Sequence, residues 1–185
     1  MYKIILLLLI SLQAMAQDQV KYKQIFSEKK QSWLIEHGVI KNQNQKDLNI
    51  YSAKILSNKE SLELKIECRV VIGKENNYLG LSIKNINNAF WENQQHVNFI
   101  FYTNHLSVSA KTNDKKTLII NNFDNINYRL VNLIGNNRNL EIRYKDNKNQ
   151  PKNDYFDLNG SYEVTSFLGK KCFIEPKKIV EKLKK

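Results

Sequence analysis

Residues 62–69 read Leu62-Glu63-Leu64-Lys65-Ile66-Glu67-Cys68-Arg69, a strict alternation of apolar and charged side chains. Because successive side chains of a β-strand point to opposite faces of the sheet, this stretch predicts a strand with one buried and one solvated face. Burial on one side only is typical of antiparallel sheets. The stretch therefore indicates an all-β, antiparallel protein.

The same two-residue period recurs on both sides of this stretch. Short strands about ten residues apart, joined by turns rich in Asn and Lys, are typical of an antiparallel β-sandwich or barrel with little helix. The period predicts further strands within residues 79–83, 97–102, 106–110, 117–121, 128–134 and 139–145. We expect a core between two sheets made of Leu64, Ile66, Leu81, Ile83, Phe99, Phe101, Leu140 and Ile142, and we expect Lys65, Lys84 and Arg143 in solvent.

Asn159-Gly160 is the clearest turn signal of the chain. Asn-Gly supplies the positive φ angles of a type I′ turn, so it predicts a hairpin that joins residues 155–158 to residues 161–167. Evidence for helix is thin. Residues 27–36 suit one or two helical turns, and residues 177–185 suit either a terminal basic helix or a last strand, since Pro176 permits both.

The first sixteen residues have the pattern of a secretory signal peptide. Lys3 supplies the positive charge, residues 4–10 form an apolar run, and Ala14-Met15-Ala16 is a small-x-small cleavage site. The apolar run is shorter than the roughly 20 residues that span a bilayer. The residue directly after the cleavage site is Gln17 and not a Cys, so no lipid anchor is indicated. We therefore expect export to the periplasm or the medium, no transmembrane segment, and a single β-sandwich domain over residues 17–185 with a basic tail at 176–185.

The charge of the chain is strongly positive, with 29 Lys and Arg against 18 Asp and Glu and a net charge of +11. Removing residues 1–16 takes away Lys3 alone and leaves +10. The charges are scattered, and the chain has no recognisable nucleic-acid-binding motif, so we expect no nucleic acid as partner. The dense cluster in the tail leaves open a peripheral contact with an anionic surface.

Two cysteines, Cys68 and Cys172, are present. An exported protein meets an oxidising compartment, where the two could form a disulfide. The alternative is that each is a small core residue of its own strand. The sequence leaves both possibilities open.

The order of several short motifs is similar to the laminin-G-like, concanavalin A-like jelly-roll domains of exported bacterial proteins. The motifs lie between residues 26 and 175, and the Leu79-Gly80 strand lacks the glycine that usually follows it. The resemblance implies two packed antiparallel sheets but no activity, because this fold carries lectins, glycan hydrolases and adhesion modules. The motifs are Phe26, residues 33–40, residues 62–69, residues 77–81, the aromatic strand 97–102, residues 139–144 and residues 156–160.

No catalytic residue is predicted. Glycan hydrolysis needs two carboxylates flanking one bond, and Glu63 and Glu67, four residues apart on one strand, would lie roughly 13 Å apart. His37, His96 and His105 have no metal-ligand spacing, so we expect no metal or other cofactor. Calcium is the one alternative, because residues 146–154 carry oxygen ligands, although without calcium-loop spacing.

One surface loop, residues 87–96, has the composition of a binding site. It combines an aromatic pair with amides and an imidazole, and the candidate ligand-binding residues are Phe90, Trp91, Asn93, Gln94 and His96. A sugar site needs a flat apolar ring for the CH face of the sugar and short polar arms for its hydroxyls. The alternative is that Phe90 and Trp91 pack on the edge of the core.

Three functions are therefore compatible with the sequence. The first is a non-catalytic binding module whose ligand is a glycan or an extracytoplasmic protein surface. The second is a glycan-processing enzyme of the concanavalin A-like class, which would have to bring together carboxylates from different strands. The third is an envelope-associated structural protein. The carboxylates available to the enzyme are Glu67, Glu92, Glu141 and Asp157.

Overall fold

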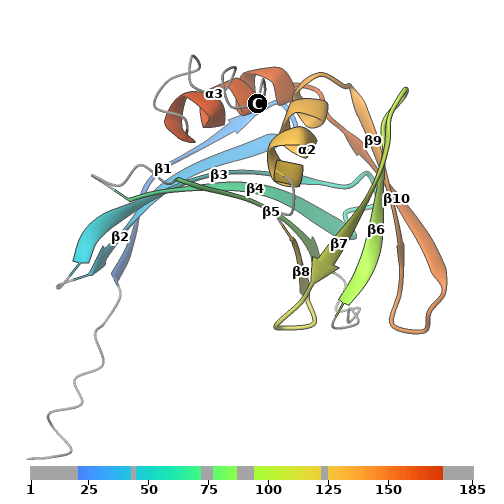
Figure 1. Cartoon of the computed structure of the whole chain (residues 1–185). Coiled ribbons are helices and arrows are strands. Elements are labelled where there is room, and N and C mark those ends of the chain that lie inside the picture. The colour runs from blue at the N-terminus through green and yellow to red at the C-terminus, as the bar shows by residue number, and fades with distance from the viewer. Residues whose placement is uncertain (1–20, 43–44, 72–76, 87–93, 122–124, 173–185) are drawn as a thin grey trace, which may run out of the picture.

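The computed structural model describes residues 21–42, 45–71, 77–86, 94–121 and 125–172. This part of the chain forms a 10-stranded antiparallel sheet and two helices (Figure 1). In chain order the elements are β1 (Lys21–Lys30), β2 (Trp33–Asn42), β3 (Gln45–Leu56), β4 (Leu62–Val71), β5 (Tyr78–Asn85), β6 (Gln94–Ile100), β7 (His105–Lys111), β8 (Thr117–Ile120), α2 (Ile126–Gly135), β9 (Asn139–Lys145), β10 (Pro151–Asp157) and α3 (Ser161–Cys172).

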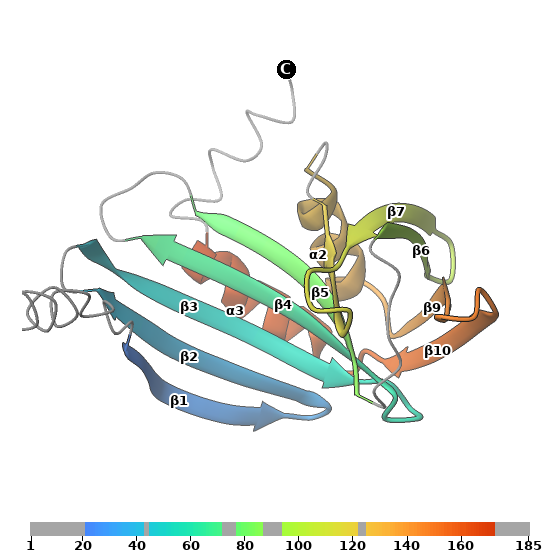
Figure 2. The same ribbon diagram turned by 90° about the horizontal axis from the view of Figure 1, so that it is seen from below.

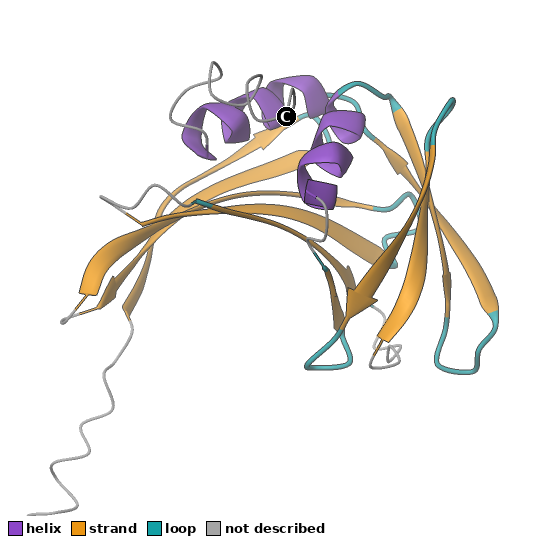
Figure 3. Cartoon of the chain, viewed as in Figure 1, coloured by secondary structure: helices purple, strands orange, loops and turns teal. Residues whose placement is uncertain are grey.

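The strands belong to one continuous sheet with the order β1-β2-β3-β4-β5-β8-β7-β6-β9-β10. The all-β class, the antiparallel pairing and the small helical content are confirmed. The fold is compatible with the predicted β-sandwich, but its two halves belong to one continuous sheet that turns between β5 and β8, so that the second half stands at an angle to the first (Figure 1). Two helices cover the apolar face of the first half and its turn (Figure 3).

The core follows from the alternation in the strands. Every predicted core residue is buried, with at most 3% of its surface exposed. Lys84 and Arg143 are exposed as predicted, whereas Lys65 is only partly exposed because its ammonium group pairs with Glu67 at 2.5 Å. The face of β1–β5 that carries Lys65 points away from α3, and neither described helix covers it (Figure 2).

A buried carboxylate, Asp154, links the last strand of the sheet to the turn between β3 and β4. Asp154 of β10 is 2% exposed, and it accepts hydrogen bonds from Ser61 Oγ at 2.7 Å and from Tyr144 Oη at 3.0 Å. Beside it, the backbone N–H of Asn58 donates to the carbonyl of Tyr155 at 2.7 Å. These bonds join the last strand to the turn between β3 and β4. Burial and the neighbouring Asp154 together raise the pKa of Tyr144, which keeps its hydroxyl a donor.

Two predictions of local structure are wrong. Residues 27–36 lie in β1, β2 and the turn between them instead of a helix, because Trp33 and Ile35 alternate with exposed or half-buried residues and pair with β3. Residues 128–134 lie in helix α2 instead of a strand. The buried residues of α2 are Asn127, Leu130 and Ile134, and this spacing of three and four is helical. Asn127 donates its side-chain amide to the carbonyl of Leu79 at 3.0 Å, which fixes α2 to β5.

The predicted hairpin at Asn159-Gly160 is also wrong. Residues 155–157 are the end of β10, but Ser161–Cys172 form helix α3, whose buried residues Ser161, Val164, Leu168 and Cys172 share one helical face. Gly160 does adopt a positive φ of 86°, and the carbonyl of Leu158 accepts a hydrogen bond from the N–H of Ser161 at 2.9 Å. The Asn-Gly signal thus marks a turn that leads into a helix. The hairpin that was part of the jelly-roll resemblance is therefore absent, and the resemblance depends on the strand motifs alone.

We expect Gly160→Val to lower the free energy of unfolding by about 1–3 kcal/mol, because a β-branched residue is strained at positive φ. Gly160→Asn should cost much less, since Asn tolerates this region. Gly169 of α3 is the matched control. A Cβ there meets nothing within 4 Å, so Gly169→Ala should stabilise the helix by up to about 1 kcal/mol. Urea unfolding measures all three, and a Gly160→Val variant as stable as the parent would contradict the assigned turn.

Cys68 and Cys172 are joined by a disulfide across 104 positions of sequence. Cys68 lies on the core face of β4 and Cys172 is the last residue of α3. The bond therefore fastens the C-terminal helix to the centre of the sheet. None of the described helices is long and apolar enough to cross a bilayer.

Candidate functional site

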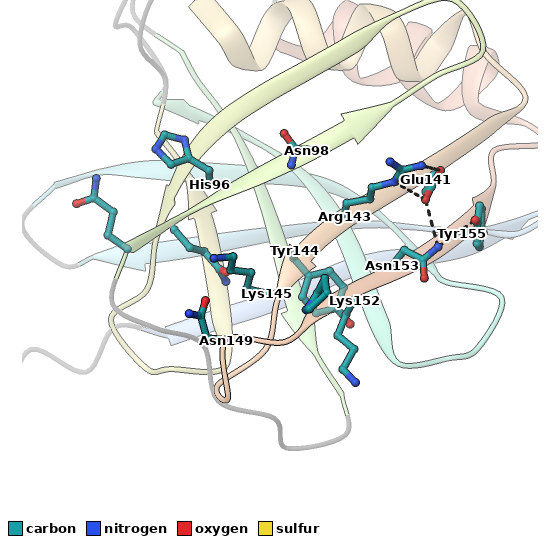
Figure 4. A pocket seen from close by; sticks show the side chains of 13 residues that line it. His96, Asn98, Glu141, Arg143, Tyr144, Lys145, Asn149, Lys152, Asn153 and Tyr155 are labelled. Atoms are coloured by element: carbon teal, nitrogen blue, oxygen red, sulfur yellow. Dashed lines mark hydrogen bonds and ion pairs between the residues drawn. The ribbon is translucent and has the colours of Figure 1, made fainter.

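A hollow of about 680 Å³ lies on the outer face of β6, β9 and β10 (Figure 4). Strand alternation creates this face. The buried side chains of Phe99, Leu140, Ile142 and Phe156 point inward, and their neighbours in each strand point outward. The outward residues that line the hollow are Gln94, His96, Asn98, Glu141, Arg143, Lys145, Asn153 and Tyr155, and Gln95, Tyr144, Asn149, Pro151 and Lys152 complete its wall.

The register of the sheet places these side chains in rows across the three strands. Arg143 of β9 lies between Asn98 of β6 and Asn153 of β10. One row further along, Glu141 lies opposite Tyr155. Side chains directly opposite each other in an antiparallel pair are within reach of one another. The face therefore presents polar groups at neighbouring positions, although they come from distant parts of the chain.

Hydrogen bonds order one end of the hollow. Arg143 donates to both carboxylate oxygens of Glu141, from Nε to Oε1 at 2.7 Å and from Nη2 to Oε2 at 3.2 Å. The side-chain amide of Asn153 donates to Glu141 Oε1 at 3.2 Å and to Tyr155 Oη at 3.0 Å. The Arg143 guanidinium holds the pKa of Glu141 below its usual value. Glu141 is thus kept as an ionised acceptor, which does not suit a general acid.

Tyr155 supplies the aromatic surface of the site. It is 46% exposed, and its hydroxyl is anchored by Asn153 while its ring remains open to solvent. An aromatic ring with one polar end combines an apolar contact surface with a fixed orientation. Together with the amides of Asn98 and Asn153, it offers what the face and the hydroxyls of a sugar ring require.

The other end of the hollow is the hairpin between β9 and β10. Asp146 Oδ1 accepts the backbone N–H groups of Lys148 and Gln150, each at 2.9 Å, and Lys152 Nζ lies 3.7 Å from Asp146 Oδ2. This hairpin is the stretch that offered oxygen ligands for calcium. Asp146 is used by the turn, and Asp154 is buried against Ser61 and Tyr144. In residues that the structure describes, no three His, Cys, Asp or Glu side chains gather as a metal site.

The predicted binding loop contributes part of this site. Gln94 and His96 are the start of β6 instead of loop, and both line the hollow from exposed positions. Phe90, Trp91 and Asn93 lie outside the described residues. The sequence indicated Glu141 only as a possible carboxylate for hydrolysis, and it did not indicate Arg143, Asn153 or Tyr155 as site residues. The signal for them was available, because alternation in residues 139–145 and 151–157 puts all four on the outer face of adjacent strands.

The described carboxylates among those considered for hydrolysis occupy separate environments. Glu92 lies outside the described residues, and Asp157 Oδ1 accepts the backbone N–H of Asn159 at 3.1 Å. Glu67 lies on the face of β4 that points away from α3, 2.5 Å from Lys65 Nζ and 2.6 Å from Arg69 Nε. Burial alone would raise the pKa of Glu67, but these two cations lower it. Of the described residues that line the hollow, Glu141 alone is acidic.

A second hollow, of about 490 Å³, lies at the ends of β2 and β3 and the turn that follows β3. It contains the aliphatic side chains of Leu34 and Leu56 and the carboxylates of Glu60 and Glu63. It has no aromatic residue in its described lining, so it lacks the flat ring that makes the first hollow suitable for a sugar.

Comparisons with models of known protein families, with curated proteins and with solved structures found no match to this chain.

Proposed function

We propose that this protein is an exported, non-catalytic binding module that holds a glycan on the outer face of β6, β9 and β10. The observation that carries the proposal is the solvent-open ring of Tyr155 beside the ordered group Glu141, Arg143 and Asn153. The group presents both donors and acceptors in fixed positions, which is the pattern that sugar hydroxyls require. Glycan binding also occurs among the concanavalin A-like proteins that the strand motifs resemble.

Binding without catalysis is favoured over hydrolysis by the charges of the site. Glycoside hydrolysis uses two carboxyl groups, one of them protonated, on either side of the bond. The described lining supplies one carboxylate, and its pKa is lowered instead of raised. Export is supported by the signal-peptide pattern and by the disulfide, since stable disulfides are typical of oxidising compartments.

Tyr155→Ala tests the proposal directly. We expect this variant to lose about tenfold or more in affinity for an oligosaccharide that binds the parent protein, because the stacking surface is removed. The measurement is titration calorimetry, after a glycan array has identified oligosaccharides that bind. Tyr162→Ala is the matched control, since Tyr162 is 67% exposed on α3 and does not line the hollow.

Retained affinity in Tyr155→Ala, or an equal loss in Tyr162→Ala, would contradict the assigned site. Absence of binding to every oligosaccharide on the array would contradict the glycan proposal and would leave a protein surface as the ligand of this face.

A further inference from the structure

The basic side chains that line the hollow differ in whether they have an ion-pair partner. Three side chains with a fixed positive charge line it, namely Arg143, Lys145 and Lys152. Arg143 pairs with Glu141, and Lys152 lies near Asp146. Lys145 makes no ion pair or side-chain hydrogen bond with any described residue and is exposed. Among the described residues, the hollow therefore carries one positive charge that has no ion-pair partner.

Lys145 and Tyr155 lie at opposite ends of the hollow. Tyr155 is opposite Glu141 in the register, and Lys145 is four residues further along β9. Four residues of strand span about 13 Å, which is longer than a single pyranose ring. The β6–β9 pairing ends at Asn98 and Arg143, so Lys145 lies two residues beyond the last β9 residue that pairs with β6, opposite Pro151 of β10. The unpaired ammonium group therefore lies at the end of the hollow formed by the hairpin, away from the aromatic ring.

We infer that the ligand of this face is an acidic oligosaccharide, with one sugar ring on Tyr155 and a carboxylate or sulfate of a later sugar at Lys145. This inference depends on the proposed glycan-binding function and adds the chemical class of the ligand to it. A neutral glycan would leave the Lys145 charge without a partner along the bound chain. An anionic group at that point gains a charge-assisted hydrogen bond, which is stronger than a neutral one.

The test compares ligands that differ in charge. The affinities of the purified protein are measured by calorimetry for a galacturonate oligosaccharide, a carrageenan-derived oligosaccharide that carries sulfate and no carboxylate, and a neutral xylose oligosaccharide of equal length. The first two arms distinguish carboxylate from sulfate as the anionic group. Each is repeated with Lys145→Gln and with the matched control Lys148→Gln, which removes the same charge from the same hairpin outside the hollow.

We expect at least one acidic oligosaccharide to bind more tightly than the neutral one. Lys145→Gln should weaken that binding by about tenfold and affect the neutral affinity much less, whereas Lys148→Gln should change neither. Raising the salt concentration from about 0.1 M to about 1 M should reduce the difference between acidic and neutral ligands.

Equal affinity for acidic and neutral oligosaccharides would overturn this inference and leave the proposed function intact. An equal loss in Lys145→Gln and Lys148→Gln would also overturn it, because the attraction would then come from the general positive charge of the chain. Absence of binding in all three arms would overturn both the inference and the proposed function.

Discussion

Breaking the disulfide between Cys68 and Cys172 should lower the free energy of unfolding by about 4–5 kcal/mol. The two cysteines are 104 positions apart, and in the chain-entropy model a cross-link over about 100 residues removes that much conformational freedom from the unfolded chain. Single domains are stable by only about 5–15 kcal/mol, so the loss is a large part of the total. The double variant Cys68→Ala, Cys172→Ala should unfold at a much lower urea concentration than the parent.

The measurement is urea unfolding of the parent and the double variant, each with and without a reductant. Reductant should move the parent curve to the position of the variant and should leave the variant unchanged, which is the internal control. An unchanged parent curve under full reduction would show that the bridge contributes nothing to stability. Loss of the bridge should also make α3 easier to unfold locally, because Cys172 is the last residue of this helix.

Phe99→Ala is expected to cost about 3–5 kcal/mol, the usual range for removing a buried phenylalanine side chain. Phe99 is fully buried in β6, and it lies opposite Leu106 of β7 and Ile142 of β9. Its ring therefore fills the part of the core that the second half of the sheet encloses. Its removal costs the transfer free energy of the ring and leaves a cavity in this part of the core, and this is why the cost is high.

Lys84→Ala is the control for this prediction. Lys84 belongs to β5, is exposed, and makes no ion pair with a described residue, so its loss should change stability by less than about 0.5 kcal/mol. Thermal or urea unfolding distinguishes the two variants. A similarly small decrease in the free energy of unfolding in both variants would contradict the inward direction of Phe99. It would also contradict the register that places Asn98 and Arg143 together on the outer face.

Local alternation predicted most of the strands correctly, because each strand must bury one face and solvate the other. Residues 62–69, 117–121 and 139–145 lie in β4, β8 and β9 with bounds close to the prediction. Alternation is ambiguous where an apolar run is short. Residues 128–134 contain apolar side chains that suit either period, and only packing of Leu130 and Ile134 against the rest of the core selects the helix.

The Asn159-Gly160 turn signal likewise does not determine which element follows it. Its positive φ at Gly160 follows from the residue type, but the direction of the following chain does not. Val164, Leu168 and Cys172 find an apolar surface on β2, β3 and β4 as a helix, and the disulfide to β4 adds to that choice. A hairpin would have placed the same residues at a sheet edge instead.

The sequence by itself determined the class of the fold, the direction of the core side chains and the bias toward positive charge, because these depend on residue type and on a period of two. The tertiary structure alone decided the order of the strands and the composition of the site. Gln94, Glu141 and Tyr155 share one hollow only because β6 pairs with β9 and β9 with β10. Pairing between strands depends on how the whole sheet curls to enclose its core, and no local stretch of sequence contains that information.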